Sequence, residues 1–192
     1  MPRRPEYDRE DLIERARDLF WAQGWAGTSL KDLEGVLKMK PGSFYAAFGS
    51  KDALYELTLE RYVRDGLARL KALAAKHGPL EALQIFPRIV IEGGHTPARA
   101  CMLSKTLLEL QPRSHPLAET ANKHLKSMEA AFADLIVLAQ AEGQVAPHHD
   151  AYALARRYQS DLMGLRISSE RDGVDAKAIA AEISESLAKL SD

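Results

Sequence analysis

Apolar residues recur at helical spacing along most of the chain, and no stretch alternates apolar and polar residues as a strand would. The first clear stripe is formed by Leu12, Ile13, Ala16, Leu19 and Phe20. A chain with this pattern can bury its apolar faces only by packing helix against helix. We therefore predict an all-α protein.

Length and composition are those of a folded globular protein. The chain has 192 residues, of which 46% are hydrophobic and 28% are charged. Its single cysteine, Cys101, excludes an intramolecular disulfide and fits a reducing compartment. The opening MPRRPEYDREDL has no apolar core of a signal peptide, and no 18-residue apolar run follows it. These features predict a soluble, cytoplasmic protein that does not enter a membrane.

Glycine, proline and capping residues divide the first 50 residues into three short helices. The segment QGWAGTS ends the first helix, and Thr28 or Ser29 can cap the second. Pro41 suits the first turn of the third helix, which Gly49 ends before Ser50 caps a fourth. The short gap between the second and third helices predicts a helix-turn-helix.

Longer helices follow, separated by segments rich in glycine and proline. We expect them at about 51–76, 79–93, 98–110, 116–142, 148–170 and 175–190. Pro87 should kink or split the helix that contains it. The change from short to long helices predicts two domains, residues 1–50 and residues 51–192.

Net charge gives no argument for nucleic-acid binding. The whole chain carries −1, and residues 1–52 contain nine Lys/Arg and nine Asp/Glu. The segment KMKPGSFYAAFGSK, residues 38–51, differs because it holds Lys38, Lys40 and Lys51 and no acid. A small cluster of charge is commonly just a solvated face, so charge alone does not assign this segment a function.

Residues 28–62, TSLKDLEGVLKMKPGSFYAAFGSKDALYELTLERY, resemble the DNA-binding region of TetR-family transcriptional regulators. The matching features are Thr28 before a short helix, the apolar pair Leu30 and Leu33, the run 42–45, Phe48 and the run 51–54. The number and length of the expected helices also match that family. The resemblance implies an N-terminal three-helix module with a helix-turn-helix, followed by a helical bundle for effector binding and dimerisation.

The resemblance also implies which residues contact DNA. Thr28, Tyr45 and Lys51 would contact the phosphate backbone, while Pro41 and Ser43 would lie closest to the bases. Physical arguments agree, because recognition helices meet the major groove with their N-terminal residues and a glycine permits close backbone approach. The predicted DNA-binding set is Thr28, Lys40, Pro41, Gly42, Ser43, Tyr45 and Lys51.

Four positions depart from the family pattern. Lys38 replaces a common glycine in the turn, so it must adopt a left-handed conformation or alter the turn. Lys40 replaces a common serine, which exchanges a helix cap for a cation. Ala47 stands in place of a histidine that would contact phosphate, and Glu34 replaces a small residue.

The helical body would hold a small-molecule effector and a second copy of the chain. The predicted effector pocket lies among the fourth to seventh helices and consists of Phe86, Ile89, Cys101, Met102, Leu107 and Phe132. Apolar stripes in the last two helices predict a homodimer interface, although they fit a protomer core equally well. The interface residues are Tyr152, Leu162, Leu165, Ile179, Ile183 and Leu187.

Cys101 has two interpretations. A thiol at a helix N-terminus beside Arg99 would have a lowered pKa and could react with electrophiles, which would make it a chemical sensor. The other interpretation, which the sequence favours, is an inert buried core residue.

Enzyme function has little support in the sequence. Glu92 and His95 have the spacing of a di-iron ligand pair, but a di-iron site needs two such pairs and further glutamates. His148 and His149 lie beside Asp150, which suits a helix cap better than a metal site. There is no nucleophilic serine elbow and no phosphate-binding glycine loop.

We therefore expect a ligand-responsive repressor that binds a near-palindromic double-stranded operator as a homodimer, without cofactor, metal or catalysis. The alternative is a helical small-molecule-binding protein, or a redox or metal enzyme-like bundle, in which residues 28–51 form a packed hairpin with no DNA-binding role.

Overall fold

The computed structural model describes residues 8–92 and 97–191, and these residues form α-helices and short 3₁₀ turns without a strand. The prediction of an all-α fold is confirmed. The elements are α1 (Arg9–Gln23), α2 (Leu30–Leu37), α3 (Pro41–Phe48), α4 (Lys51–His77), α5 (Pro79–Glu92), α6 (Met102–Leu110), η1 (Gln111–Arg113), α7 (Pro116–Ala141), α8 (Ala151–Ser168), α9 (Ala176–Ala188) and η2 (Lys189–Ser191).

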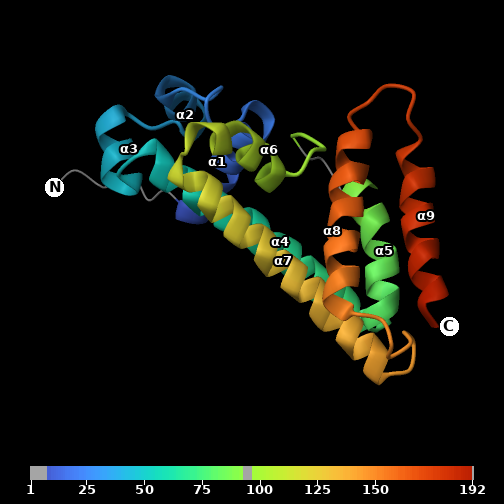
Figure 1. Cartoon of the computed structure of the whole chain (residues 1–192). Helices are drawn as coiled ribbons and strands as arrows, with labels where there is room; N and C mark the ends of the chain where they lie inside the picture. Colours follow the sequence, from blue (N-terminus) through green and yellow to red (C-terminus); the bar gives the residue numbers. More distant parts are fainter. Residues whose placement is uncertain (1–7, 93–96, 192) are drawn as a thin grey trace.

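The two longest helices, α4 and α7, pack against each other and run diagonally through the molecule (Figure 1). At one end they carry α1, α2, α3 and α6, and at the other end they carry α5, α8 and α9. The N-terminal helices and the C-terminal pair α8 and α9 thus lie at opposite ends. The elongated shape places the candidate recognition helix α3 far from α9.

Local capping residues set the boundaries of the N-terminal helices. Ser29, rather than Thr28, caps α2, and it forms a reciprocal capping box with Asp32. Ser50 accepts the Ala53 N–H at the start of α4, and Pro41 occupies the first turn of α3. These boundaries agree with the predicted ones to within a few residues.

Three predicted boundaries in the body differ from the structure. Helix α6 begins at Met102 instead of 98, because Glu170 Oε1 accepts the N–H groups of Arg99 and Ala100 and holds them outside the helix. Helix α8 begins at Ala151, since Asp150 caps it. Pro87 does not split α5, which continues from Pro79 to Glu92, and the kink predicted there stays a prediction.

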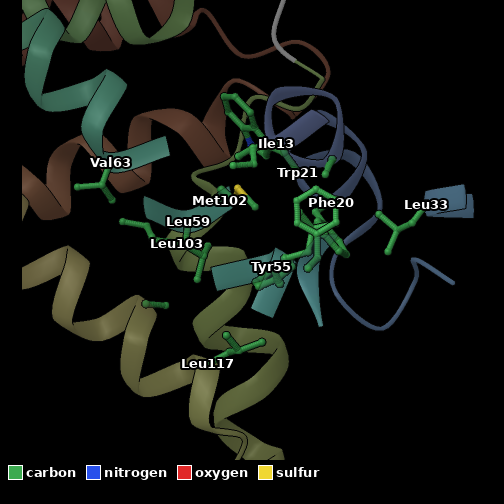
Figure 2. Close-up of a cluster of buried hydrophobic side chains, with 14 of the residues drawn as sticks. Ile13, Phe20, Trp21, Leu33, Tyr55, Leu59, Val63, Met102, Leu103 and Leu117 are labelled. Carbon is green, nitrogen blue, oxygen red and sulfur yellow. The ribbon is translucent and has the colours of Figure 1, made fainter. Parts of the chain in front are cut away.

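Two clusters of buried apolar side chains form the core. The first joins α1, α2, α3, the first half of α4, α6 and the start of α7. Figure 2 shows part of it, with Phe20 and Trp21 of α1 facing Tyr55 and Leu59 of α4 and Met102 of α6. The second cluster joins the far end of α4 to α5, the rest of α7, α8 and α9. Met128 packs against both clusters.

The first cluster also contains a buried polar contact. Thr106 donates its hydroxyl hydrogen to the Met102 carbonyl, so the 2.7 Å bond between Tyr55 Oη and Thr106 Oγ1 has tyrosine as the donor. The Tyr55 ring meets the Phe20 ring edge-on at 4.7 Å. These contacts join α1, α4 and α6, so the N-terminal helices share their core with helices beyond residue 50.

Candidate nucleic-acid interface and ligand cavity

The turn between α2 and α3 is formed by residues 38–40. Lys38 follows α2 with φ 54° and ψ 41°, so it takes the left-handed conformation in which glycine is common. Its N–H approaches the Glu34 and Gly35 carbonyls and closes the helix. Met39 is buried, and Lys40 is the exposed N-cap of α3.

Helix α3 has one buried face and one exposed face. Phe44 and Phe48 are buried and lie 5.7 Å apart between ring centroids, which fixes the rotation of this short helix. The opposite face leaves Pro41, Gly42 and Ser43 exposed, and 48% of Tyr45 is accessible. The N-terminal turn of α3 is therefore free to enter a groove, as recognition helices do.

Lys51 lies at the N-terminus of α4, next to this surface. Its Nζ lies 4.2 Å from the centroid of the Trp25 ring, and Trp25 Nε1 donates to Asp52 Oδ1 at 2.8 Å. Partial burial lowers the pKa of Lys51, and the nearby carboxylates of Asp52 and Glu109 oppose this effect. The indole thus holds an ammonium beside the first N–H groups of α4, an arrangement suited to a phosphate.

Thr28 lies elsewhere than its predicted role requires. Its side chain is 0% exposed, and its hydroxyl donates to the Gly24 carbonyl at 2.7 Å. In this conformation the hydroxyl stabilises the loop before α2 and does not face solvent. The remaining residues of the predicted DNA-binding set lie on the α3 surface or at the start of α4.

Residues that the sequence did not single out hold this surface in place. Arg9 donates to the Ala47 carbonyl at 3.0 Å and lies 5.4 Å from the Phe48 ring centroid, which ties α1 to the end of α3. Trp25 supports Lys51, as described above. Both contacts join residues far apart in sequence, so local patterns do not reveal them.

Helix α6 is joined to the N-terminal helices by two charged side chains. Glu109 accepts the N–H groups of Trp25 and Ala26 at 3.0 and 2.7 Å, in the loop that follows α1. Lys105 Nζ donates to the Trp21 carbonyl at 2.6 Å, at the C-terminal end of α1. We call these contacts of Lys105 and Glu109 the α6 clamp. Any displacement of α6 must carry the end of α1 with it or break these bonds.

A cavity of about 190 Å³ lies where the two hydrophobic clusters meet. Its wall is formed by residues of α1, α4, α5, α7 and α8 together with Pro97 and Cys101. Of the predicted pocket residues, Phe86, Cys101 and Phe132 line it. Met102 is buried in the first cluster, Leu107 packs against that cluster, and Ile89 is half-buried outside the lining set.

Among the lining residues that the prediction missed, six are aromatic or charged. These are Arg17, Trp21, Tyr62, Asp65, Arg69 and Arg166. Trp21 and Tyr62 meet edge-on at 5.1 Å between ring centroids, and Trp21 Nε1 donates to the Ala100 carbonyl at 2.7 Å. Through Arg17 and Trp21 the cavity therefore borders α1, a helix of the N-terminal module.

Cys101 is the N-cap residue of α6 and is largely buried at the cavity wall. The Tyr62 hydroxyl donates to its sulfur at 3.6 Å. Arg99, which the sequence placed beside the thiol, directs its guanidinium to the Ser169 carbonyl. The contacts of Cys101 are thus with a phenol and the cavity, and whether its thiol reacts stays a prediction.

The predicted dimer residues divide between the core and the surface. Leu162, Leu165, Ile183 and Leu187 are buried within the protomer, and Ile179 packs against the same cluster. Tyr152 is 59% exposed, and Ile167, at the other end of α8, is 49% exposed. In this conformation, a second copy of the chain could contact the exposed residues of α8 and not the buried leucines.

The described residues show little that suits metal chemistry or membrane insertion. Within them, no three His, Cys, Asp or Glu side chains gather as metal ligands would. Asp150, from the candidate His148–Asp150 metal site, caps α8. His95, from the candidate di-iron pair, lies outside the described residues. No helix in 8–92 or 97–191 is both long and apolar enough to cross a bilayer.

Comparison with known proteins agrees with this geometry. The family described as "Bacterial regulatory proteins, tetR family" matches residues 12–58, which span α2, α3 and most of α1. The HTH-type transcriptional repressor ComR of Escherichia coli (strain K12) is 29% identical over 178 residues, 90% of this chain and 84% of its own. The HTH-type transcriptional repressor DhaR of Mycobacterium sp. (strain GP1) is 23% identical over 87% of this chain and 86% of its own.

Solved structures extend the similarity to the whole chain. A cysteine mutant of the TetR family transcriptional regulator CifR, complexed with 26 bp double-strand operator DNA, superposes with a TM-score of 0.84. It is 26% identical and covers 98% of this chain and 99% of its own. Reduced NemR from E. coli shares the fold with a TM-score of 0.78 over 92% of this chain and 95% of its own, at 18% identity. The family match and these full-length similarities lead to one conclusion: this chain belongs to the TetR family of bacterial transcriptional regulators, which are DNA-binding proteins and not enzymes.

Proposed function

We propose that this chain is a cytoplasmic, ligand-responsive repressor that binds a near-palindromic operator as a homodimer. The observation that carries the proposal is the exposed N-terminal turn of α3 beside Lys51. The repressor names of its relatives and the operator complex of CifR support the same assignment.

In this proposal α3 enters the major groove. Pro41, Gly42 and Ser43 lie against base edges, with Lys40 near the groove edge, and Tyr45 and Lys51 bind phosphates. Thr28 contributes by holding the loop before α2, because its hydroxyl is already bonded to Gly24. Two such helices in a dimer read half-sites about one turn of DNA apart, roughly 34 Å.

The dimer interface is proposed on the outer faces of α8 and α9. Tyr152 and Ile167 are exposed apolar side chains on α8, and both helices lie at the end of the molecule away from α3. The buried leucines and isoleucines of the same helices support this face from within the protomer. The proposed domain division near residue 50 separates the DNA-binding helices from this body.

Repression would be relieved by a small molecule in the cavity. A ligand changes the population of two conformations only if it binds one of them more tightly. The cavity borders α1 and the segment before α6, so its occupation can favour an arrangement of α1 and α6 that does not fit the operator. The α6 clamp provides the connection between these helices.

The test is a fluorescence-anisotropy titration of purified protein against labelled DNA from the region upstream of its own gene, at several salt concentrations. A repressor should bind one fragment specifically, and log K should fall steeply with log salt because bound phosphates release counterions. Binding that is absent at low salt, or equal for unrelated DNA, would contradict the proposal. In that case a DNA-independent ligand-binding role would be the better assignment.

A further inference from the structure

The cavity at the junction of the two clusters has a size that limits its ligand. Its volume is about 190 Å³. Apolar cavities of roughly 150 Å³ accommodate benzene. Two ring pairs contribute to its wall: Trp21 with Tyr62 at 5.1 Å, and Phe86 with Phe132 at 6.0 Å between centroids. The space therefore suits one ring with a small substituent.

The cavity wall contains more basic than acidic side chains. Three arginines line it, Arg17, Arg69 and Arg166, against one acid, Asp65. Asp65 is already engaged, because Arg17 lies 3.0 Å from its Oδ2 and Arg61 lies 2.9 Å from the same oxygen. Arg17 also pairs with Asp18 at 2.8 Å, and Arg69 is exposed to solvent. The arginine charge of the wall that is both partly buried and not balanced by Asp65 is therefore that of Arg166.

Arg166 is the arginine best placed to bind a ligand. It is half-buried on α8, and its Nη1 donates at 3.0 Å to the Arg99 carbonyl, which is a neutral acceptor. Within residues 8–92 and 97–191 no carboxylate forms an ion pair with it, and Glu170, one turn away, is occupied by the N–H groups of Arg99 and Ala100. A partly desolvated guanidinium with no counterion gains most from an anion.

Tyr62 supplies a second polar group at the same place. Among the residues that the structure describes, its hydroxyl donates to the Cys101 sulfur alone, at 3.6 Å, and sulfur is a weak acceptor. Tyr62 and Arg166 both line the cavity. Burial raises the pKa of Tyr62, and the positive charge of Arg166 opposes that rise. The phenol stays protonated at neutral pH and can transfer its hydrogen bond to a stronger acceptor.

We propose that this cavity binds a small monocarboxylate with an apolar, ring-sized body. The carboxylate is held by Arg166 and Tyr62, and the body lies among Trp21, Phe86 and Phe132. A neutral molecule of the same shape fills the cavity and leaves Arg166 unpaired, and a cation is repelled by the Arg166 guanidinium. This assignment names the ligand class of the regulatory response proposed above and rests on that function only for its effect on DNA.

Three probes of nearly equal shape test the charge requirement: benzoate, benzamide and benzamidine. Isothermal titration calorimetry on the full chain should show benzoate binding at least about tenfold more tightly than benzamide, since a charge-assisted pair is replaced by a neutral one. Benzamidine should not bind. Cyclohexanecarboxylate serves as a second acid with a saturated ring. Equal binding of benzoate and benzamide, or no binding of either acid, would overturn the proposal.

Substitutions in α8 test the role of Arg166 in binding the carboxylate. Arg166→Met keeps the aliphatic stem and should abolish the preference for benzoate over benzamide, while Arg166→Lys should retain part of it because the charge remains without the planar fork. Arg157→Met removes an exposed arginine of the same helix and should bind benzoate as the wild type does. Circular dichroism checks that each variant folds. A preference that survives in Arg166→Met refutes the role of this side chain.

Measuring benzoate binding and operator binding on the same protein distinguishes a failure of the ligand class from a failure of the regulatory function. If benzoate binds and no specific operator is found, the ligand class stands and the regulatory function fails. If an operator is bound and neither acid binds the protein, the ligand class fails alone. If benzoate binds and weakens operator affinity, both stand.

Discussion

Two single side chains, Tyr45 and Lys51, are expected to carry much of the phosphate binding. Tyr45→Phe removes one hydrogen bond per protomer, so we expect the favourable free energy of operator binding to fall by about 0.5–1.5 kcal/mol for each hydrogen bond lost.

Lys51→Ala should weaken binding to DNA of any sequence and reduce the slope of log K against log salt by about one per protomer. The measurement is the salt-dependent anisotropy titration described above.

Lys71→Ala provides the control for Lys51→Ala. It removes an exposed lysine of the same helix, 20 residues and about 30 Å further along α4. An unchanged salt slope in Lys51→Ala, or an equal reduction in Lys71→Ala, would remove Lys51 from the interface.

Lys38 is strained by its conformation, and glycine should relieve that strain. At φ 54° a glycine avoids the steric cost of a Cβ, so Lys38→Gly should raise the free energy of unfolding by about 0.5–1 kcal/mol. Urea denaturation followed by circular dichroism measures it. Lys40→Gly is the matched control, because Lys40 has φ −77° and should show no such gain. A loss of stability in Lys38→Gly would show that the lysine side chain contributes more than the strain costs.

The α6 clamp is expected to stabilise the loop that follows α1. Glu109→Ala would leave the N–H groups of Trp25 and Ala26 without their acceptor, so we expect a loss of about 1–3 kcal/mol in stability. Glu109→Gln should lose less, since its amide oxygen can still accept one of the two bonds. The same urea denaturation measures both variants. Equal stability of Glu109→Ala and wild type would mean that water satisfies these groups.

The sequence predicted the helices of the N-terminal module well, because their signals are local. Ser29, Pro41 and Ser50 act within a few residues of where they stand, so their positions can be read from the chain. The clamp was not predictable in the same way, because Glu109 and Trp25 meet only after α6 has packed on α1. The fold was therefore easier to predict than the contacts between its helices.

The same limit explains the pocket and dimer predictions. Apolar periodicity showed that Leu162 and Leu165 lie on a buried face, but periodicity does not say whether the covering surface belongs to the same chain. In the cavity, the aromatic pair Phe86 and Phe132 was foreseen, whereas Arg166 and Trp21 come from helices that no local pattern connects. The hydrophobic pattern of the sequence therefore predicted apolar residues of the cavity, whereas its arginines could be identified only from the structure.

At the scale of the whole molecule, the proposed dimer should depend on the exposed face of α8. Ile167→Glu would place a charge in that interface, so we expect monomers in analytical ultracentrifugation and a large loss of operator affinity. Leu108→Glu changes a more exposed residue, on α6, and should leave the dimer intact. A dimer that survives Ile167→Glu would place the interface elsewhere.

Alkaline pH should destabilise the whole molecule through its buried tyrosines. Burial raises the pKa of Tyr55 to about 12, and it also raises the pKa values of Tyr62 and Tyr158. Unfolded tyrosines lose their protons near pH 10, before the folded ones, so the unfolded state binds fewer protons above that pH. The free energy of unfolding should therefore fall as the pH rises from about 10 to 12.

Urea denaturation at pH 8, 10 and 11 measures this fall. Tyr55→Phe keeps the ring that packs on Phe20, and Thr106 keeps its bond to the Met102 carbonyl. Stability should thus fall less steeply with pH in Tyr55→Phe than in the wild type. Identical slopes would show that other groups cause the alkaline loss.

The shared core of the N-terminal helices has a consequence for biosynthesis. The cluster that packs α1, α2 and α3 is completed by Leu103, Leu110 and Leu117 and extends to Leu125. During translation at about 5–20 residues per second, these residues follow the recognition helix by several seconds. The DNA-binding helices of a nascent chain would stay incompletely packed for that time. A chain that stops before α7 should be degraded instead of occupying the operator.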